Sequence, residues 1–545
     1  MLSRFRLTPL LARSPLCSKL GRLLMLSWIG LAVAATSALA AVPTPTVSTP
    51  PAGLHGFPFG RASVDLAAVE YTETEFLITG NAQAFVSDGA LGNDGVWNVS
   101  PGVTAPFTSR MLVRAPADPQ RFNGTVLVEW LNVSGGVDAA PEFDYSHVEL
   151  LREGYAWVGV TAQAAGADFL KEFDSVRYAA IFHPGDSFSY DIFSQAGMAV
   201  LHGNTLPLGR LTPQIRQVLA VGESQSAFRL FTYYNAIQPA AEIYQGFLIH
   251  STGSGAALSQ SVAAVGVLGG SNIPTPPGVP ATPDIAVPAT AFIRTDLAQP
   301  VMFVNTETDV TVLGAGFSVH NQPDSNTFRM WELAGTTHAD GYLLQFAGAD
   351  AAASGLPVPP FGCGNPPLNN GPETFSMRMA LHALNLWTAV PALKPSIGPR
   401  FTVEIVNSPS PAAVLTRDPA TGLAIGGIRL PQVAVPIETL TGVRPAAAVA
   451  ANPNCILFGA ASPWDGGADP WDGVAGLDPA PSPAPSLAAL YGTKFNYIRR
   501  FEVAAFQSVI RGFMLPGDII EEINLANEAD VPVGSAANAA IIPSP

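Results

Sequence analysis

The stretch that decides the fold is Val218-Leu219-Ala220-Val221-Gly222-Glu223-Ser224-Gln225-Ser226-Ala227-Phe228. Its opening apolar run predicts a buried strand, and a helical pattern begins at or just after Ser224. The positions two before and two after this serine hold Gly222 and Ser226, which are small, as a tight strand-to-helix turn requires. The stretch therefore predicts a turn that presents the Ser224 hydroxyl at the end of a strand, the geometry known as a nucleophile elbow.

The motif alone is a weak signal, because a chain rich in Gly, Ser and Ala contains similar patterns by chance. One such pattern is Gly185-Asp186-Ser187-Phe188-Ser189, which follows His183-Pro184 instead of a strand. The context therefore favours Ser224 over Ser187 as a nucleophile.

A serine hydroxyl becomes a good nucleophile only when a base takes its proton and a third group orients that base. Where the serine stands on such an elbow, an acid and then a histidine follow it along the chain. The histidines after Ser224 are His250, His320, His338 and His382. His338 lies in a Gly/Thr-rich loop directly after a strand-like segment, where the base belongs. His250 ends a strand and either lines the site or packs, and the apolar helical surroundings of His382 indicate a structural role.

The acid is expected in the turn after another strand. The apolar run 301–304 leads into Asn305-Thr306-Glu307-Thr308-Asp309, and Asp309 occupies the usual place of the acid. Glu307 is the alternative. Asp340 is too close in sequence to His338 to be preferred and is expected to support the histidine loop.

An acyl-transfer site also needs two fixed N–H donors for the oxyanion. Gln225, which follows the serine, supplies one from its backbone. The second is expected from the backbone of Asn132 and Val133, in the Gly-containing loop after the strand-like run 125–130. The alternative interpretation of that loop is an ordinary glycine turn.

Strand-like and helix-like segments alternate along the chain, which predicts an α/β fold with a mostly parallel central sheet and helices on both faces. Residues 61–390 are expected to form this core. A Gly/Pro-rich insertion at 253–299 is a candidate lid, and residues 391–545 form a C-terminal extension packed on the core, with helical stretches at 501–513 and 518–526. The predicted strands include 111–114, 125–130, 155–160, 217–221, 246–249, 301–304 and 328–331.

The N-terminus has the three-part layout of a secretory signal peptide over residues 1–40. Basic residues precede the apolar run 23–33, and Ala38-Leu39-Ala40 provides a cleavage signal before Ala41. The alternative is an uncleaved membrane anchor. Residues 41–60 then form a Pro/Thr-rich leader with little expected structure. The mature protein is therefore predicted to be secreted or periplasmic, with no membrane association after cleavage.

Composition narrows the function classes further. The formal net charge of −15 makes a non-specific nucleic-acid binder implausible, and 48% hydrophobic residues exclude a disordered chain. After signal removal two cysteines remain, Cys363 and Cys455, which predict one disulfide closing a loop of about 90 residues. The alternative is two buried thiols. Their surroundings lack the spacing of a metal site. The expected serine chemistry needs neither a metal nor an organic cofactor.

These motifs resemble a bacterial family of secreted α/β-hydrolase-domain proteins with a GESQSA elbow. The stretches that carry the resemblance are 128–134, 222–227, 306–309, 334–340 and 426–431. The resemblance covers most of the mature chain. It implies the α/β-hydrolase fold, a Ser-His-acid site and ester hydrolysis without a particular natural substrate. Ser226 replaces the commoner glycine, and its small size leaves the elbow intact.

The expected function is that of a serine hydrolase that cleaves small or polymeric carboxylic esters through an acyl-enzyme formed on Ser224. The alternatives are an acyltransferase or an amidase with the same three residues, or a secreted binding protein on a hydrolase scaffold that has lost the chemistry. No nucleic-acid partner is expected, and the sequence does not indicate an oligomeric state.

Overall fold

The computed structural model describes residues 41–202, 207–252, 287–288, 290–311, 313, 320–358, 361–394, 403–407, 414–464 and 486–531. The chain divides into two compact units, Met1–Ala38 and Leu39–Pro545, and every described residue belongs to the second. The predicted signal peptide and most of the predicted lid lie outside the described residues. The domain boundaries at residues 60 and 390 remain predictions.

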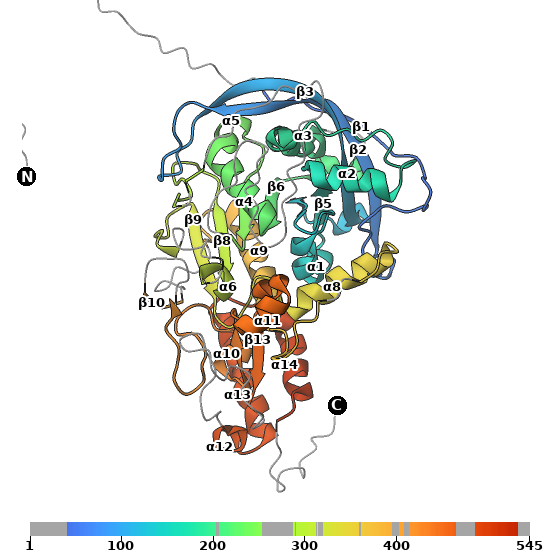
Figure 1. Cartoon of the computed structure of the whole chain (residues 1–545). Coiled ribbons are helices and arrows are strands. Elements are labelled where there is room, and N and C mark those ends of the chain that lie inside the picture. The colour runs from blue at the N-terminus through green and yellow to red at the C-terminus, as the bar shows by residue number, and fades with distance from the viewer. Residues whose placement is uncertain are drawn as a thin grey trace, which may run out of the picture. The chain divides into compact units, whose positions relative to one another are not determined.

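Nine strands of the described residues form one sheet in the order β1-β2-β3-β5-β4-β6-β7-β8-β9 (Figure 1). The pairs from β5 to β9 are parallel, whereas β1, β2, β3 and β5 pair antiparallel at one edge. The strands are β1 (Thr46–Ser48), β2 (Tyr71–Ser87), β3 (Val99–Pro116), β4 (Thr125–Trp130), β5 (Ala156–Val160), β6 (Gln217–Glu223), β7 (Gly246–His250), β8 (Val301–Thr306) and β9 (Phe328–Leu333).

The seven strands predicted within 111–331 are confirmed in this sheet, and β1 and β2 are additions to it that the sequence did not indicate. The leader at 41–60 therefore contains more structure than predicted. Its β-branched residues Thr46 and Val47 pair with β2, and the backbone N–H groups of Leu54 and His55 donate to the Asp174 carboxylate at 2.6 and 3.1 Å.

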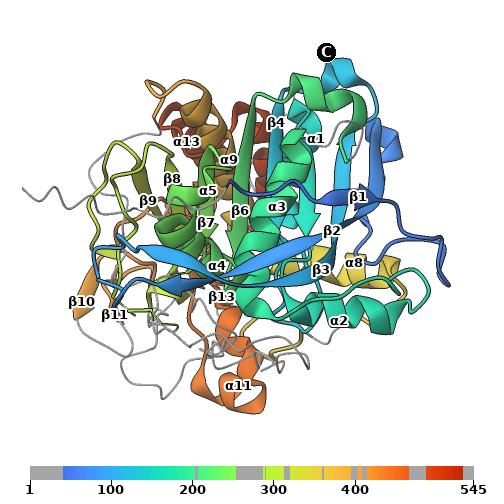
Figure 2. The ribbon, with the colours of Figure 1, turned by 90° about the horizontal axis from the view of Figure 1, so that it is seen from above.

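Helices cover both faces of the sheet because alternate residues of each buried strand point to opposite sides. In β6, Val218 and Ala220 pack in one core with α3 (Ser189–His202) and α4 (Gln225–Thr232). The intervening residues of β6 pack in a second core with α1 (Pro141–Glu153) and α9 (Glu373–Ala389). The β2–β3 hairpin passes alongside α3 in Figure 2. Gln195 Nε2 of α3 donates to the Asn81 carbonyl of β2 at 2.7 Å.

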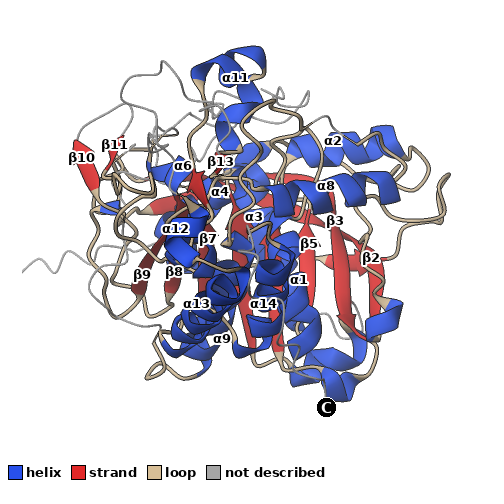
Figure 3. Ribbon diagram, turned by 90° about the horizontal axis from the view of Figure 1, so that it is seen from below, coloured by secondary structure: helices blue, strands red, loops and turns tan. Residues whose placement is uncertain are grey.

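The C-terminal part packs on the second core, and α9, α13 and α14 lie together in Figure 3. Arg378 of α9 donates to Glu521 of α14 at 2.7 Å. Both predicted C-terminal helices are confirmed. The remaining described helices are α2 (Ala164–Phe173), α5 (Gln238–Ala241), α6 (Glu307–Val310), α8 (Gly341–Ala353), α10 (Pro431–Ala434), α11 (Ala446–Ala451) and α12 (Leu487–Tyr491), with α13 at Lys494–Ile510 and α14 at Ile519–Glu528. Four short strands, β10 (Ile405–Asn407), β11 (Val414–Leu415), β12 (Glu438–Thr441) and β13 (Ala460–Pro463), form two small sheets.

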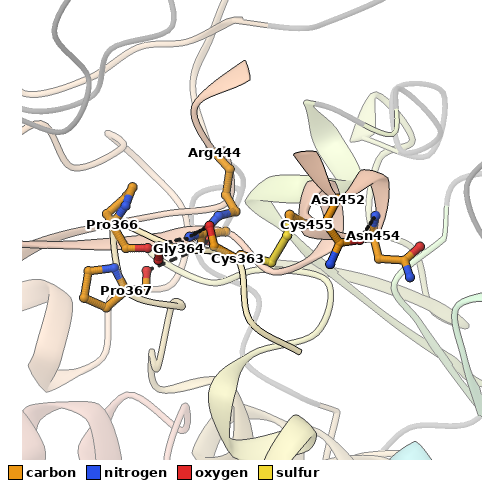
Figure 4. Close-up of a disulfide and its surroundings, with 9 residues drawn as sticks. Cys363, Gly364, Pro366, Pro367, Arg444, Asn452, Asn454 and Cys455 are labelled. Carbon is orange, nitrogen blue, oxygen red and sulfur yellow. Dashed lines mark hydrogen bonds between the residues drawn. A yellow bond between two sulfur atoms is a disulfide. The ribbon is translucent and has the colours of Figure 1, made fainter. Parts of the chain in front are cut away.

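The predicted disulfide between Cys363 and Cys455 is confirmed, with Cα atoms 5.7 Å apart (Figure 4). It joins the loop after α8 to a short 3-10 helix at Pro453–Leu457. The buried guanidinium of Arg444 donates to carbonyl groups of the same loop, including that of Cys363 at 3.3 Å. Among the described residues, every helix is too short or too polar to cross a bilayer.

Candidate active site

Ser224 stands in the turn between β6 and α4 with φ 54° and ψ −121°, a conformation that non-glycine residues rarely adopt. Ser226 braces this turn, because its hydroxyl donates to the Glu223 carbonyl at 2.7 Å and accepts from the Glu223 N–H at 3.2 Å. A Cβ atom at Gly222 would lie only 3.0 Å from Leu230 Cδ1 and 3.1 Å from Ser226 Oγ. The tight packing explains why both flanking positions hold small residues.

The structure brings Ser224, His338 and Asp309 together from three different strand ends. His338 Nε2 lies 2.7 Å from Ser224 Oγ, and His338 Nδ1 lies 2.6 Å from Asp309 Oδ1. Asp309 is fully buried, and its second oxygen accepts from the backbone and hydroxyl groups of Thr306 at 2.8 and 2.7 Å. The carboxylate is therefore fixed in the orientation that holds the imidazole against the serine.

Electrostatics favour a charged His338 beside a charged Asp309. Burial would raise the pKa of Asp309, but attraction to His338 and the hydrogen bonds from His338 and Thr306 outweigh burial and lower that pKa. Burial likewise opposes a charge on His338, but Asp309 and then Glu223 outweigh it and raise the pKa of His338 above its ordinary value. The imidazole is thus a stronger base than a free histidine.

The alternative acid, Glu307, does not contact His338. Its carboxylate accepts from the N–H groups of Gly335 at 2.7 Å and Gly442 at 3.1 Å, and from the Arg417 guanidinium at 3.2 Å. Glu307 therefore ties the turn at 305–309, the acid turn, to the loop at 334–340 that carries His338, the histidine loop, and to the C-terminal part of the chain. The geometry favours Asp309 as the partner of His338.

The histidine loop is held from several sides. The Ala334 N–H donates to the Ile428 carbonyl at 3.0 Å, and the Leu457 carbonyl accepts from Thr337 Oγ1 at 2.8 Å and the Ala339 N–H at 3.1 Å. Asp340 caps α8 by accepting from the Leu343 N–H at 2.9 Å, which fits its expected supporting role. Most of these contacts come from beyond residue 400, so the C-terminal part helps to place His338.

One oxyanion prediction is wrong. The Asn132 N–H donates to the Ala139 carbonyl at 2.9 Å in a short antiparallel bridge, so it cannot serve an oxyanion. The backbone N–H groups of Val133 and Gln225 have no acceptor among the described residues, and Gln225 opens α4, where N–H groups point outward from the helix end. Val133 and Gln225 remain the candidate pair.

Sequence reasoning missed the role of Glu223. Its Oε1 atom lies 3.4 Å from His338 Nε2, while the Asn132 side-chain amide donates to Glu223 Oε2 at 3.1 Å and to its carbonyl at 3.2 Å. Glu223 occupies a variable position of the elbow motif, and no sequence signal distinguishes it. Asn132 thus contributes its side chain, not its N–H, to the site.

The other histidines after Ser224 have separate partners. The His250 ring lies between Glu142 and Glu373 at 3.1 and 3.0 Å, and its carbonyl accepts the Ser224 N–H at 2.9 Å. His320 pairs with Glu332 at 2.7 Å, and His382 pairs with Glu149 at 2.9 Å. No group of three or more His, Cys, Asp or Glu residues in the described part of the chain is arranged to hold a metal ion.

A mostly parallel sheet with helices on both faces, and a buried Ser-His-Asp arrangement at its strand ends, define the class of α/β hydrolases. The chain belongs to the α/β hydrolase domain family, which it matches over residues 42–523.

Several solved structures are similar to this chain at 13% identity. Dienelactone hydrolase from Anabaena variabilis is similar over 50% of this chain and 94% of its own, with a TM-score of 0.25. A serine hydrolase without a lid from Xanthomonas campestris is similar over 51% and 97%, with a TM-score of 0.24. Glucuronoyl esterase from Solibacter usitatus is similar over 40% and 55%, with a TM-score of 0.22. No protein with a curated description matches the chain.

Proposed function

We propose that this protein hydrolyses carboxylic esters through an acyl-enzyme on Ser224. The observation that carries the proposal is the continuous hydrogen-bonded series from Ser224 Oγ to His338 at 2.7 Å and from His338 to Asp309 at 2.6 Å. A nucleophile, a base and a group that orients the base are the three parts that such chemistry needs. Membership of the α/β hydrolase domain family supports the same reaction class.

In the proposed reaction, Ser224 Oγ attacks the acyl carbon and its proton passes to His338 Nε2. The Gln225 and Val133 N–H groups hold the oxyanion. Collapse of the intermediate breaks the ester bond, and the leaving alkoxide takes the proton from His338. A water molecule then repeats the sequence at the acyl carbon, which releases the acid and restores Ser224.

We also propose that the mature enzyme begins at Ala41 and acts outside the cytoplasm, as the signal-peptide pattern suggests.

The test is hydrolysis of p-nitrophenyl esters, from acetate to palmitate, by the mature protein and by two serine variants. Ser224→Ala is expected to lose about 10³-fold or more in kcat because the nucleophile is gone. Ser187→Ala is the matched control, since Ser187 is the buried serine of the other G-x-S pattern, and it should retain activity.

Equal activity of the parent and a folded Ser224→Ala variant would contradict the proposal. A folded parent protein that cleaves none of the esters would also contradict it. Assays with amide substrates and with alcohol acceptors would then test the amidase and acyltransferase alternatives.

A further inference from the structure

A second buried carboxylate faces His338 from the side of Ser224. Glu223 precedes the nucleophile directly and is only 4% exposed. Its Oε1 atom lies 3.4 Å from His338 Nε2, the same nitrogen that lies 2.7 Å from Ser224 Oγ. His338 therefore has a carboxylate at each ring nitrogen, with Asp309 at Nδ1.

Neighbouring groups hold both the side chain and the backbone of Glu223 in place. Asn132 donates to both its carboxylate and its carbonyl, at 3.1 and 3.2 Å. Ser226 fixes its backbone from the other side. A buried carboxylate with one hydrogen bond from a neutral amide is costly unless a positive charge compensates it. The nearest group that becomes positive during the proposed reaction is His338.

The titratable groups that interact with Glu223 come from several elements around the elbow. Burial raises the pKa of Glu223 to about 7, although the attraction of His338 and His250 works in the opposite direction. Burial opposes a charge on His250, but its two carboxylate partners outweigh burial and raise its pKa well above the ordinary value. The charged and titratable groups around Glu223 are His338, His250, Glu142, Asp309 and Tyr145.

We infer that Glu223 is a positioning residue for His338, which holds the imidazole on the nucleophile side and stabilises the imidazolium formed in each proton transfer. The inference rests on the proposed ester hydrolysis. The proton still moves from Ser224 Oγ to His338 Nε2 and then to the leaving oxygen. Glu223 acts in its charged form: it gives or takes no proton in these steps, forms no covalent bond, and acts only through its contact with Nε2.

The pH profile distinguishes this role from a purely structural one. His338 must be neutral to accept the serine proton, so kcat/KM rises with pH as His338 loses its proton. The charge of the nearby Glu223 influences the pH at which this rise, the acidic limb of the profile, occurs. Glu223→Gln removes a negative charge beside Nε2 but keeps the shape of the side chain. We expect the acidic limb of the kcat/KM profile to move by at least about half a pH unit to lower pH. We also expect kcat on the plateau above this limb to fall about tenfold, with little change in KM.

The control is Asp191→Asn, which also neutralises a buried acid. Asp191 lies on α3, accepts from the Gln83 N–H and from Gln195 Nε2, and contacts no residue of the site. Its variant should keep the parent limb and plateau. A direct measurement, the titration of the downfield Nδ1 proton of His338 by NMR, should show the same decrease in the Glu223→Gln variant without any turnover.

An acidic limb and a His338 titration that both stay unchanged in folded Glu223→Gln would overturn the inference, while the ester activity of the parent would leave the proposed function standing. If Glu223→Gln does not fold, Asn132→Ala replaces it. That variant removes the tether and promotes protonation of Glu223, so the limb should again move to lower pH, and an unmoved limb would overturn the inference equally.

Discussion

At the scale of single residues, the two acids of the turn after β8 have different tasks. Asp309 bonds to His338, whereas Glu307 bonds to Gly335, Gly442 and Arg417. Asp309→Asn should therefore reduce kcat by about 10³- to 10⁴-fold, because an amide can hold the imidazole in the wrong tautomer and cannot stabilise its charge. Glu307→Gln should keep kcat within about tenfold and lower the melting temperature instead.

The measurement is steady-state hydrolysis of p-nitrophenyl acetate alongside thermal unfolding of each variant. If Glu307→Gln lost more activity than Asp309→Asn at equal folded fraction, the assignment of the acid would be reversed. The Asp309→Asn variant should also show its acidic limb at lower pH, since Asp309 is the strongest influence that raises the pKa of His338.

Ser224, His338 and Asp309 could be predicted as candidates because each lies in the turn or loop after a recognisable strand. The Asn132–Glu223 contact could not be predicted from motifs, since it joins positions 91 residues apart. It depends on β4 lying beside β6 in parallel, which brings the loop after β4 to the end of β6. The prediction for the Asn132 N–H is wrong for a different, local reason, because only the folded loop shows its bridge to Ala139.

At the scale of elements, a buried acid explains why the sequence did not reveal strand β2. Glu75 of β2 is buried and bonds to Arg177 at 2.5 Å, Tyr178 at 2.8 Å and Arg110 at 3.4 Å. An acid at an inward position breaks the apolar pattern by which strands are recognised. The parallel strands were recognised because continuous apolar runs are typical of strands covered on both faces.

The disulfide anchors the piece of the C-terminal part that contacts the histidine loop. Cys455 lies in the 3-10 helix that ends at Leu457, whose carbonyl accepts from Thr337 and Ala339 on both sides of His338. Replacing both cysteines by serine should lower the free energy of unfolding by about 2–5 kcal/mol, because the bond closes a loop of 92 residues. Activity should fall at a lower temperature than in the parent, as the histidine loop loses support.

Denaturant titration and residual activity after heating would measure both effects. The same loss of stability is expected when the parent is unfolded in the presence of a reductant, and the Cys363→Ser, Cys455→Ser variant should then show no further change. A double variant as stable as the oxidised parent would contradict this role of the bond.

At the scale of the whole molecule, the C-terminal part is a structural component of the site. Residues beyond 400 supply Ile428 and Leu457 to the histidine loop, and Arg417 and Gly442 to the acid turn. Two strand ends from the core thus depend on residues that lie 94 to 135 positions further along the chain. The matched family region, residues 42–523, includes this segment.

Gly442 offers a direct test of that dependence. Its N–H donates to Glu307 and its carbonyl accepts from Thr308 Oγ1 at 2.6 Å. A Cβ atom at this position would lie 2.4 Å from the Thr308 backbone nitrogen and 2.6 Å from Glu307 Cβ. Gly442→Ala must therefore push away the acid turn that carries Asp309, at a cost of about 1–3 kcal/mol in unfolding free energy.

We expect this variant to fold but to lose at least about tenfold in kcat, because a displacement near 1 Å of a group that orients a base is enough to reduce turnover. Gly362→Ala is the matched control, since a Cβ atom there meets no atom of the described residues within 4 Å. Full activity of Gly442→Ala, with a melting temperature equal to that of Gly362→Ala, would mean that the C-terminal part lies against the acid turn without determining the position of Asp309. A loss of kcat in Gly442→Ala alone would show that the Ser-His-Asp geometry is set jointly by the hydrolase core and by the segment that follows it.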